Sequence, residues 1–93
     1  MKVQNMTGNS GREIANQFVI QEGDIEYFQS YNSIIVKVDR SDYPAKVYLD
    51  ETYWDYSRTT GKYRNKFLGI DKRETEQRIK DGRFILADLN PGA

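Results

Sequence analysis

Residues 45–69 read AKVYLDETYWDYSRTTGKYRNKFLG, and the spacing of the apolar side chains changes within this stretch. Up to Leu49 the apolar and polar residues alternate, which is typical of a half-buried β-strand. Tyr56, Tyr63 and Phe67 instead share one face of a helix, which indicates an amphipathic α-helix. The chain therefore passes from sheet to helix close to Tyr56.

Shorter runs before this stretch also have the composition of strands. They cover residues 17–21, 25–31 and 33–38, and the run 45–49 follows them. Pro44 separates this last run from the others, because proline does not fit within a central strand. The connections between the runs are short, and short connections join antiparallel neighbours. We therefore expect an antiparallel meander of about four strands.

The part of the chain after the meander contains signals for two helices and one more strand. Ser57 suits the N-cap of the first helix, and Gly69 suits its C-terminal cap. Gly61 inside this helix costs about 1 kcal/mol relative to alanine, so a start only at Thr59 or Thr60 is the alternative. Asp71, followed three residues later by a glutamate, predicts a second helix over residues 72–80. Residues 83–89 alternate again. The predicted fold class is α+β, an antiparallel meander followed by a short helical hairpin and a final strand.

The domain organisation follows from the length and from the polar start of the chain. Residues 1–12 contain two glycines among polar residues, which predicts a flexible N-terminal arm. Residues 13–93 are expected to form a single α+β domain, because a chain this short supports one hydrophobic core. The helices should cover one face of the sheet. The side chains expected in the core between them are Phe18, Ile20, Ile34, Val36, Val47, Leu49, Phe67, Leu68 and Ile79.

The composition argues against an enzyme. The 93 residues include no cysteine and no histidine, so disulfides, thiolate metal sites and the commonest general base are all missing. We expect a protein without catalytic activity, cofactor or metal. The sequence contains no run of eighteen apolar residues and begins without the apolar segment of a signal peptide. A cytoplasmic location without membrane contact is therefore expected.

The charges are balanced overall but unevenly placed. Residues 1–56 carry nine acidic and five basic side chains, and residues 57–93 carry nine basic and five acidic ones. Such asymmetry is typical of a protein with one side that faces a polyanion, or of two halves that attract each other.

The segment 53–67 is the main candidate for function. Four basic residues and no acidic one lie between Ser57 and Lys66, among hydroxyl and aromatic side chains. Such residues contact phosphates and stack on bases, although the same pattern also arises when a helix buries its aromatic stripe and exposes the bases. The candidate nucleic-acid- or anion-binding residues are Trp54, Tyr56, Ser57, Arg58, Thr59, Thr60, Lys62, Tyr63, Arg64 and Lys66.

Two parts of the chain resemble a known group of proteins. Residues 27–35 (YFQSYNSII) and 54–69 (WDYSRTTGKYRNKFLG) resemble a family of small proteins that bacteriophages and other mobile elements encode, without an assigned activity. The resemblance extends over roughly residues 16–90. It implies that the protein acts in the cytoplasm of an infected bacterial host.

A second resemblance concerns residues 67–84 alone. A helix, a glycine-containing turn, a polar helix and a closing glycine follow one another there, and this order resembles excisionase-like helix-turn-helix proteins. The resemblance implies that the second helix faces a DNA groove. The side chains that it would present there are Lys72, Arg73 and Gln77.

These observations predict a non-enzymatic, phage-type binding protein that engages nucleic acid or host nucleic-acid-handling machinery through residues 53–67. The alternative is an inhibitor of a host defence system, either anti-CRISPR-like or a sink for a nucleotide signal, which uses its acidic first half or the basic segment. Self-association into a homo-oligomer is a third hypothesis. The acidic side chains of the alternative are Asp24, Glu26, Asp39, Asp42, Asp50 and Glu51.

Overall fold

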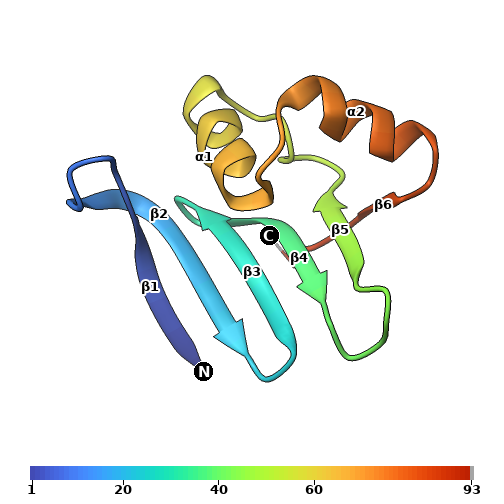
Figure 1. Ribbon diagram of the computed structural model, residues 1–93, viewed down its shortest axis with the longest axis horizontal. Helices are drawn as coiled ribbons and strands as arrows, with labels where there is room; N and C mark the ends of the chain where they lie inside the picture. Colours follow the sequence, from blue (N-terminus) through green and yellow to red (C-terminus); the bar gives the residue numbers. More distant parts are fainter. Residues whose placement is uncertain (93) are drawn as a thin grey trace.

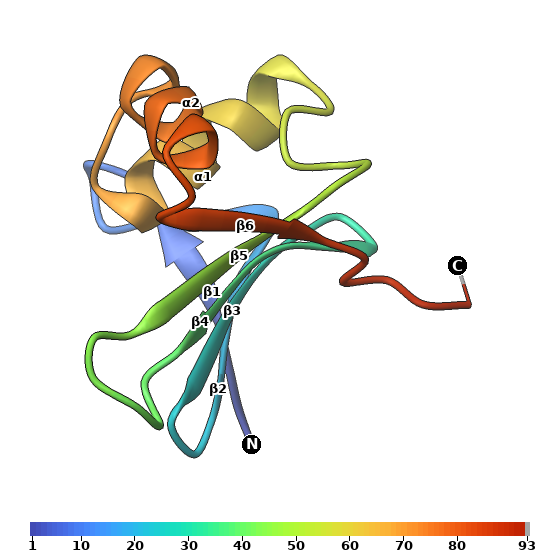
Figure 2. The same cartoon turned by 90° about the vertical axis from the view of Figure 1, so that its right-hand side faces the viewer.

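Within residues 1–92, six strands form one sheet, and two helices lie over one of its faces (Figure 1) (Figure 2). The computed structural model describes residues 1–92. The elements are β1 (Lys2–Thr7), β2 (Glu13–Glu22), β3 (Ile25–Ser30), β4 (Ser33–Asp39), β5 (Lys46–Asp50), α1 (Arg58–Leu68), α2 (Lys72–Lys80) and β6 (Phe84–Ala87).

The strands are neighbours in the order in which they follow one another along the chain. The pairs from β1 to β5 are antiparallel, whereas β5 and β6 are parallel because the chain crosses between them through both helices. The α+β class is therefore confirmed. About four strands in the meander is an undercount, since the meander has five strands, β1 to β5, and β6 makes six in the part of the sheet formed by residues 1–92.

The undercount arises at the N-terminus, where residues 2–7 were expected to belong to an arm and instead form the edge strand β1. Val3 pairs with Ile20 and Asn5 with Phe18 across β1 and β2. Only Met6 of this strand is buried, so the apolar alternation that would predict a strand is weak. Backbone pairing needs no particular side chains, which is why a polar segment can complete the edge of a sheet.

The ends of both helices confirm the predicted caps, and α1 begins at Arg58 instead of Thr59 or Thr60. The Ser57 Oγ accepts a hydrogen bond from the Thr60 backbone N–H at 3.1 Å, and Gly69 closes α1 with φ of 74°. The carboxylate of Asp71 accepts from the Glu74 N–H at 2.8 Å and begins α2 at Lys72, as expected.

The core lies between the sheet and the helices, and part of its predicted membership is wrong. Val36 and Leu49 are fully buried there, and Phe67 stacks on Phe28 with 5.7 Å between ring centroids. The three corrections concern Phe18, Ile20 and Ile34, which lie outside the buried core. The observed buried core is Met6, Phe28, Ile35, Val36, Val38, Leu49 and Phe84, with Val47, Phe67, Leu68 and Ile79 packed partly buried against it.

Register explains these corrections. Apolar residues follow one another at positions 18–20, so alternation alone does not say which of them point inward, and a shift of one residue reverses both faces of a strand. The structure turns Gln17 and Val19 toward the helices. In β4 a bulge opposite Phe28 adds one residue, so that Ile35 and Val36 are both buried.

The C-terminal tail completes the sheet where β4 extends beyond its pairing with β5. The Asn90 side chain accepts from the Ile34 N–H at 2.8 Å and donates to the Ile34 carbonyl at 2.9 Å. The Asp50 carboxylate accepts from the backbone of Leu89, Thr52 and Tyr53. These contacts hold the segment that leads from β5 into α1. Within residues 1–92 no helix is long and apolar enough to cross a membrane.

Candidate anion-binding site

The first turn of α1 separates two hollows in the protein surface. One is lined mainly by cationic side chains of α1 and α2, and its volume is about 630 Å³. The other is lined by tyrosines and hydroxyl groups, and its volume is about 610 Å³. Ser57, the N-cap of α1, lines both. We call them the basic hollow and the tyrosine hollow.

The basic hollow contains four cationic side chains and one carboxylate. They are Arg58 and Lys62 from the outer face of α1, Arg64 beneath them, Lys72 from the start of α2, and Asp55 from the connection before α1. Arg58 and Lys62 are exposed. In the part of the chain that the structure describes, neither of them forms an ion pair, so their charges are available to a ligand.

Arg64 is a buried cation at the back of this hollow, with 1% of its surface exposed. Its Nη1 donates to the Trp54 carbonyl at 2.7 Å and to Asp55 at 3.3 Å, and its Nη2 donates to Asn65 at 2.9 Å. Its guanidinium also lies over the Trp54 ring, 5.2 Å from the centroid. Arg64 therefore joins the connection to α1 and adds its charge from below the surface.

Asp55 is shared between Arg64 and Lys72. The Lys72 Nζ lies 2.7 Å from one oxygen of this carboxylate, and the Arg64 Nη1 lies 3.3 Å from the other. Partial burial acts to raise the pKa of Asp55, but the hydrogen bonds from Lys72 and Arg64 outweigh it and lower that pKa below its ordinary value. The hydrogen bond and the charge of Asp55 in turn raise the pKa of Lys72. Asp55 and Lys72 are therefore both charged at neutral pH.

Gly61 provides the surface against which the Arg64 guanidinium lies. A Cβ built at this position would be 3.7 Å from Arg64 Nη2 and 3.9 Å from an oxygen of Asp55. These distances are ordinary van der Waals contacts. Any side chain longer than that of alanine would extend into the basic hollow.

The tyrosine hollow lies on the other side of the α1 N-terminus. Its walls include Tyr31 from the β3–β4 turn, and Tyr53 and Tyr56 from the connection before α1. Tyr56 is 69% exposed and makes an edge-to-face contact with Tyr53, with 5.5 Å between ring centroids. The buried Thr60 hydroxyl lines the hollow too, and it lies 3.0 Å from the Ser30 hydroxyl.

The structure thus divides the predicted ten-residue site. Arg58, Lys62 and Arg64 line the basic hollow, and Tyr56, Thr59 and Thr60 line the tyrosine hollow. The remaining residues of the predicted set, apart from Ser57, do not line these hollows. They are Trp54, Tyr63 and Lys66.

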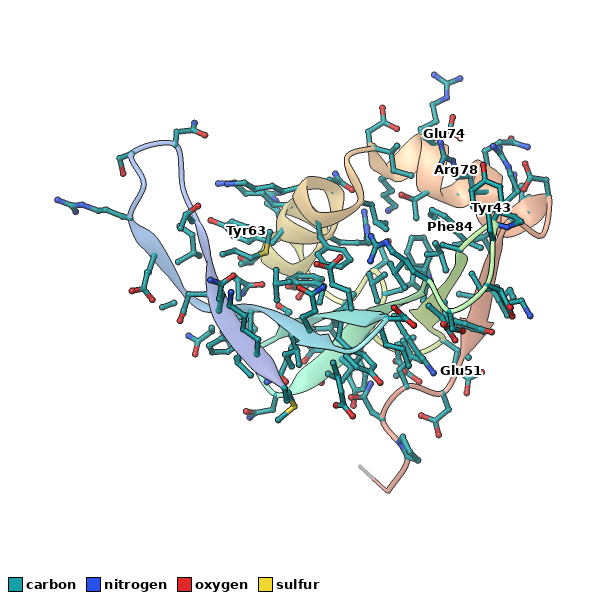
Figure 3. The ribbon with its side chains drawn as sticks, turned by 60° about the horizontal axis from the view of Figure 1, so that its bottom comes forward. Tyr43, Glu51, Tyr63, Glu74, Arg78 and Phe84 are labelled. Atoms are coloured by element: carbon teal, nitrogen blue, oxygen red, sulfur yellow. The ribbon has the colours of Figure 1, made fainter. Side chains whose placement is uncertain are left out.

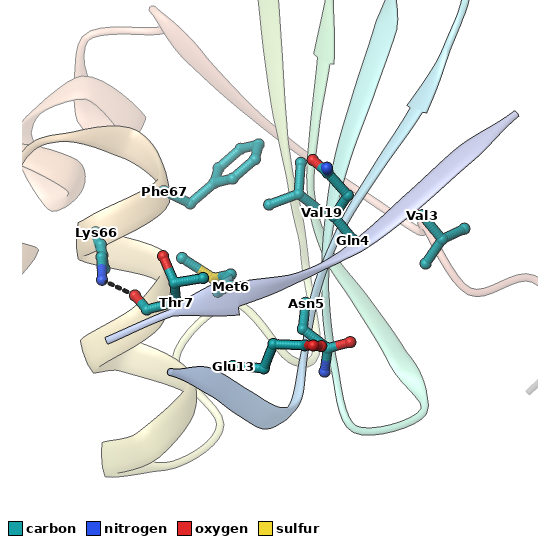
Figure 4. A pocket seen from close by; sticks show the side chains of 9 residues that line it. All are labelled: Val3, Gln4, Asn5, Met6, Thr7, Glu13, Val19, Lys66 and Phe67. Atoms are coloured by element: carbon teal, nitrogen blue, oxygen red, sulfur yellow. Dashed lines mark hydrogen bonds between the residues drawn. The ribbon is translucent and has the colours of Figure 1, made fainter. Parts of the chain in front are cut away.

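Each of these three side chains has contacts elsewhere. Trp54 packs against the core under Arg64, and Tyr63 also packs against the core, with the Lys62 Nζ 5.3 Å from its ring centroid. The Lys66 ammonium donates to the Thr7 carbonyl at the end of β1, beside a different hollow of about 640 Å³ under α1 (Figure 4).

The three predicted contacts of the second helix are also separated. Lys72 belongs to the basic hollow, where Asp55 binds it. Arg73 and Gln77 are exposed beside a smaller hollow of about 320 Å³ on the outer side of α2. The order of helix, turn, helix and strand is present, but these three side chains do not form one surface.

Sequence reasoning missed the residues that complete both hollows. Asp55 lies within the predicted segment, yet nothing in its spacing indicates that it pairs with Lys72. Tyr31 lies in the β3–β4 turn, far from α1 along the chain. The only sequence signal for Tyr31 is the unusual choice of a tyrosine in a tight turn, and that signal gives no neighbour in space.

The fold and the hollows define a small α+β sheet protein that carries a cationic site on its helical face. The chain belongs to a family of unknown function (DUF8033), which it matches over residues 1–83. No curated protein and no solved structure matches the chain. Because the family description names no function, the bacteriophage setting and the excisionase-like resemblance stay predictions.

Proposed function

We propose that the protein is a non-enzymatic binding protein whose basic hollow holds the phosphate groups of a nucleic acid. The observation that carries this proposal is the arrangement of Arg58 and Lys62. Both are exposed and without an ion pair in residues 1–92, over a hollow whose inner wall includes the buried Arg64 guanidinium. Arginine and lysine side chains that face a common hollow are suited to phosphate oxygens.

The N-terminus of α1 adds to the positive potential. The first turn of this helix contains no acidic side chain, so the partial positive charge of its backbone N–H groups is not offset there. Asp55 cancels only part of the charge of Arg64 and Lys72, because one carboxylate is shared between two cations. The local field therefore favours an anion although the whole chain is neutral.

The phage setting would make nucleic acid, or a host protein that handles it, the natural partner. The alternative of an inhibitor that presents acidic side chains has less support in the structure. Asp50 of that acidic set is buried and accepts backbone hydrogen bonds, and Glu26 pairs with Arg40 at 3.2 Å. The set is therefore not a continuous row of free carboxylates.

The test is a fluorescence-anisotropy titration with labelled single-stranded DNA, duplex DNA and RNA at low and physiological salt. We expect salt-sensitive binding that Arg58→Ala together with Lys62→Ala weakens by tenfold or more, since each lost phosphate contact costs about 1 kcal/mol. The matched control is Lys46→Ala with Lys80→Ala, which removes two exposed lysines from outside the hollow. Arg64 is left in place, because its removal would disturb the connection to α1.

The control pair removes the same net charge, so an equal loss of affinity in both double variants would show that the hollow has no special role. Absence of binding to all three probes at low salt would overturn the proposal. Co-purification of a protein partner from infected cells would then be the experiment for the inhibitor hypothesis.

A further inference from the structure

We propose that the tyrosine hollow holds an unpaired nucleobase while the phosphate attached to it lies in the basic hollow. This inference rests on the proposed function and specifies its ligand, which is a single strand or a free nucleotide and not a duplex. A base in a duplex is paired and stacked, so it cannot enter a separate hollow without leaving the helix.

The walls of the hollow are suited to a planar ring. Tyr56 and Tyr31 are 69% and 50% exposed, and the fully buried Ile35 also lines the hollow. Tyr53, partly buried, holds Tyr56 through its edge-to-face contact. Exposed tyrosine faces around an apolar side chain are the arrangement on which bases stack, since every base has a π-face.

The polar groups of the hollow are suited to the edge of a base. The side chains of Asn32 and Thr59 line it, and within residues 1–92 they form no hydrogen bond to another protein group. An amide offers both a donor and an acceptor, and a hydroxyl offers the same. The hollow therefore has an apolar face for stacking and free polar groups for the ring nitrogens and exocyclic groups.

The two-residue turn between β3 and β4 requires a positive φ at its first residue, and that residue is Tyr31. Its φ is 55°, in the left-handed region that glycine and asparagine occupy far more easily than a bulky aromatic residue. The Asn16 carbonyl accepts from the Tyr31 N–H at 2.7 Å, and Gln29 donates to the Tyr31 carbonyl at 2.7 Å, which holds this conformation. A tyrosine at this position costs stability, and the hollow is the place where its side chain acts.

The two hollows adjoin at the N-cap of α1, and this adjacency indicates which chemical groups the ligand contains. Ser57 lines both, so an anion over Arg58 and Lys62 and a ring beside Tyr56 lie on either side of one residue. A base and its phosphate are joined through one sugar, which matches two adjoining sites, one aromatic and one cationic. A simple anion would leave the tyrosines without a role.

The experiment compares two labelled strands of about 12 nucleotides, within the site sizes of small single-strand binders, one of mixed sequence and one with every base removed. Both carry the same phosphates. We expect the complete strand to bind at least about fivefold more tightly, the effect of stacking one base on an aromatic side chain. Tyr56→Ala should remove most of that ratio and leave the affinity for the abasic strand unchanged.

Tyr31→Gly is the second variant, and it separates binding from folding. Glycine relieves the left-handed strain, so its melting temperature should not fall, while the preference for the complete strand should decrease. Tyr43→Ala is the control, because Tyr43 is 99% exposed on the β4–β5 connection, beside the α2 end of the molecule (Figure 3). This control should bind both strands as the wild type does.

The outcomes distinguish this inference from the proposed function. Equal affinity for the complete and abasic strands, with both weakened by Arg58→Ala and Lys62→Ala, would keep the proposed function and overturn the base site. Tighter binding of a duplex than of the single strand would likewise overturn the base site and keep the proposed function. Binding of mononucleotides in competition with the strand would identify the free nucleotide as the source, and no binding of any probe would overturn both proposals.

Discussion

Position 61 places a glycine in the first half of a helix, where alanine is favoured by up to about 1 kcal/mol. The Gly61 backbone is not in the left-handed region, and an added Cβ would meet Arg64 and Asp55 only at ordinary contact distance. No steric reason therefore forbids alanine. The remaining difference is that a methyl group would lie in the wall of the basic hollow.

We expect Gly61→Ala to raise the melting temperature by about 4–8 °C, because a gain of about 1 kcal/mol has that effect in a domain of this size. The same variant should bind single-stranded nucleic acid more weakly, since the methyl group narrows the basic hollow that Gly61 lines. Differential scanning calorimetry and an anisotropy titration measure the two effects. A lower melting temperature would show that the guanidinium needs the space that glycine leaves.

Asp55→Asn removes the negative charge that Arg64 and Lys72 share. The pKa of the Asp55 carboxyl is lowered in the folded protein, so the folded state binds a proton there less tightly than the unfolded chain does. Protonation of Asp55 in acid therefore reduces the stability of the folded state. The free energy of unfolding of the variant should be about 1–2 kcal/mol lower than that of the wild type at pH 7, because Arg64 and Lys72 lose a charged acceptor.

The difference in the free energy of unfolding between the wild type and Asp55→Asn should be constant above about pH 5. It should shrink as the pH falls through the lowered pKa of Asp55. Urea unfolding at pH 7, 5 and 3 measures it. A difference that stayed the same at pH 3 would show that the ionised carboxylate is not what stabilises the cluster.

The elements differ in how they are held, and β1 contributes one side chain to the core. Met6 is the only residue of this strand in the core, with 7% of its surface exposed, whereas Val3 is 52% exposed. The Lys66 side chain adds a hydrogen bond to the Thr7 carbonyl at the strand end. The Asn5 side chain also donates a hydrogen bond to the Ile14 carbonyl of β2 at 3.0 Å. β1 is therefore part of the folded sheet through backbone pairing, one buried methionine and these two side-chain hydrogen bonds.

We expect Met6→Ala to reduce the free energy of unfolding by about 2–3 kcal/mol, since truncation of a buried methionine loses transfer energy and leaves a cavity. Val3→Ala, on the exposed side of the same strand, is the control and should cost less than about 1 kcal/mol. Chemical denaturation measures both. If Met6→Ala were as stable as the wild type, residues 1–12 would behave as a flexible arm in solution.

The whole molecule is neutral, and this limits how it can bind a polyanion. With no net charge to attract DNA at long range, binding depends on the few cations of the basic hollow. Two or three phosphate contacts give a slope of about −1.4 to −2 for the logarithm of affinity against the logarithm of salt concentration on a single strand. Anisotropy at four salt concentrations measures this slope.

A slope near zero would contradict direct phosphate contact. A much steeper slope would mean that cations outside the hollow take part, among them Arg73 on the outer side of α2. Repeating the measurement with Arg58→Ala and Lys62→Ala should make the slope shallower by about 1.4, because two contacts of about 0.7 each are removed.

Local sequence determined the elements whose signals lie within a few residues of one another. The caps at Ser57 and Asp71, the helix over residues 72–80 and the turn glycine at 69 depend on hydrogen bonds that span three or four positions, and all are confirmed. Such contacts form wherever the backbone becomes helical, so the sequence alone is sufficient to predict them.

The strand register, the edge strand β1 and the grouping of the site residues depend on contacts between residues that are distant along the chain. Which of Phe18 and Val19 faces the core depends on the register between strands, and β1 exists because β2 offers it an edge. The ten residues of the predicted site, from α1 and the connection before it, are divided between the two hollows, the core and the end of β1, and Asp55 and Tyr31 complete the hollows. Helical spacing places side chains around an axis, but only packing decides which are buried and which neighbours the exposed ones meet.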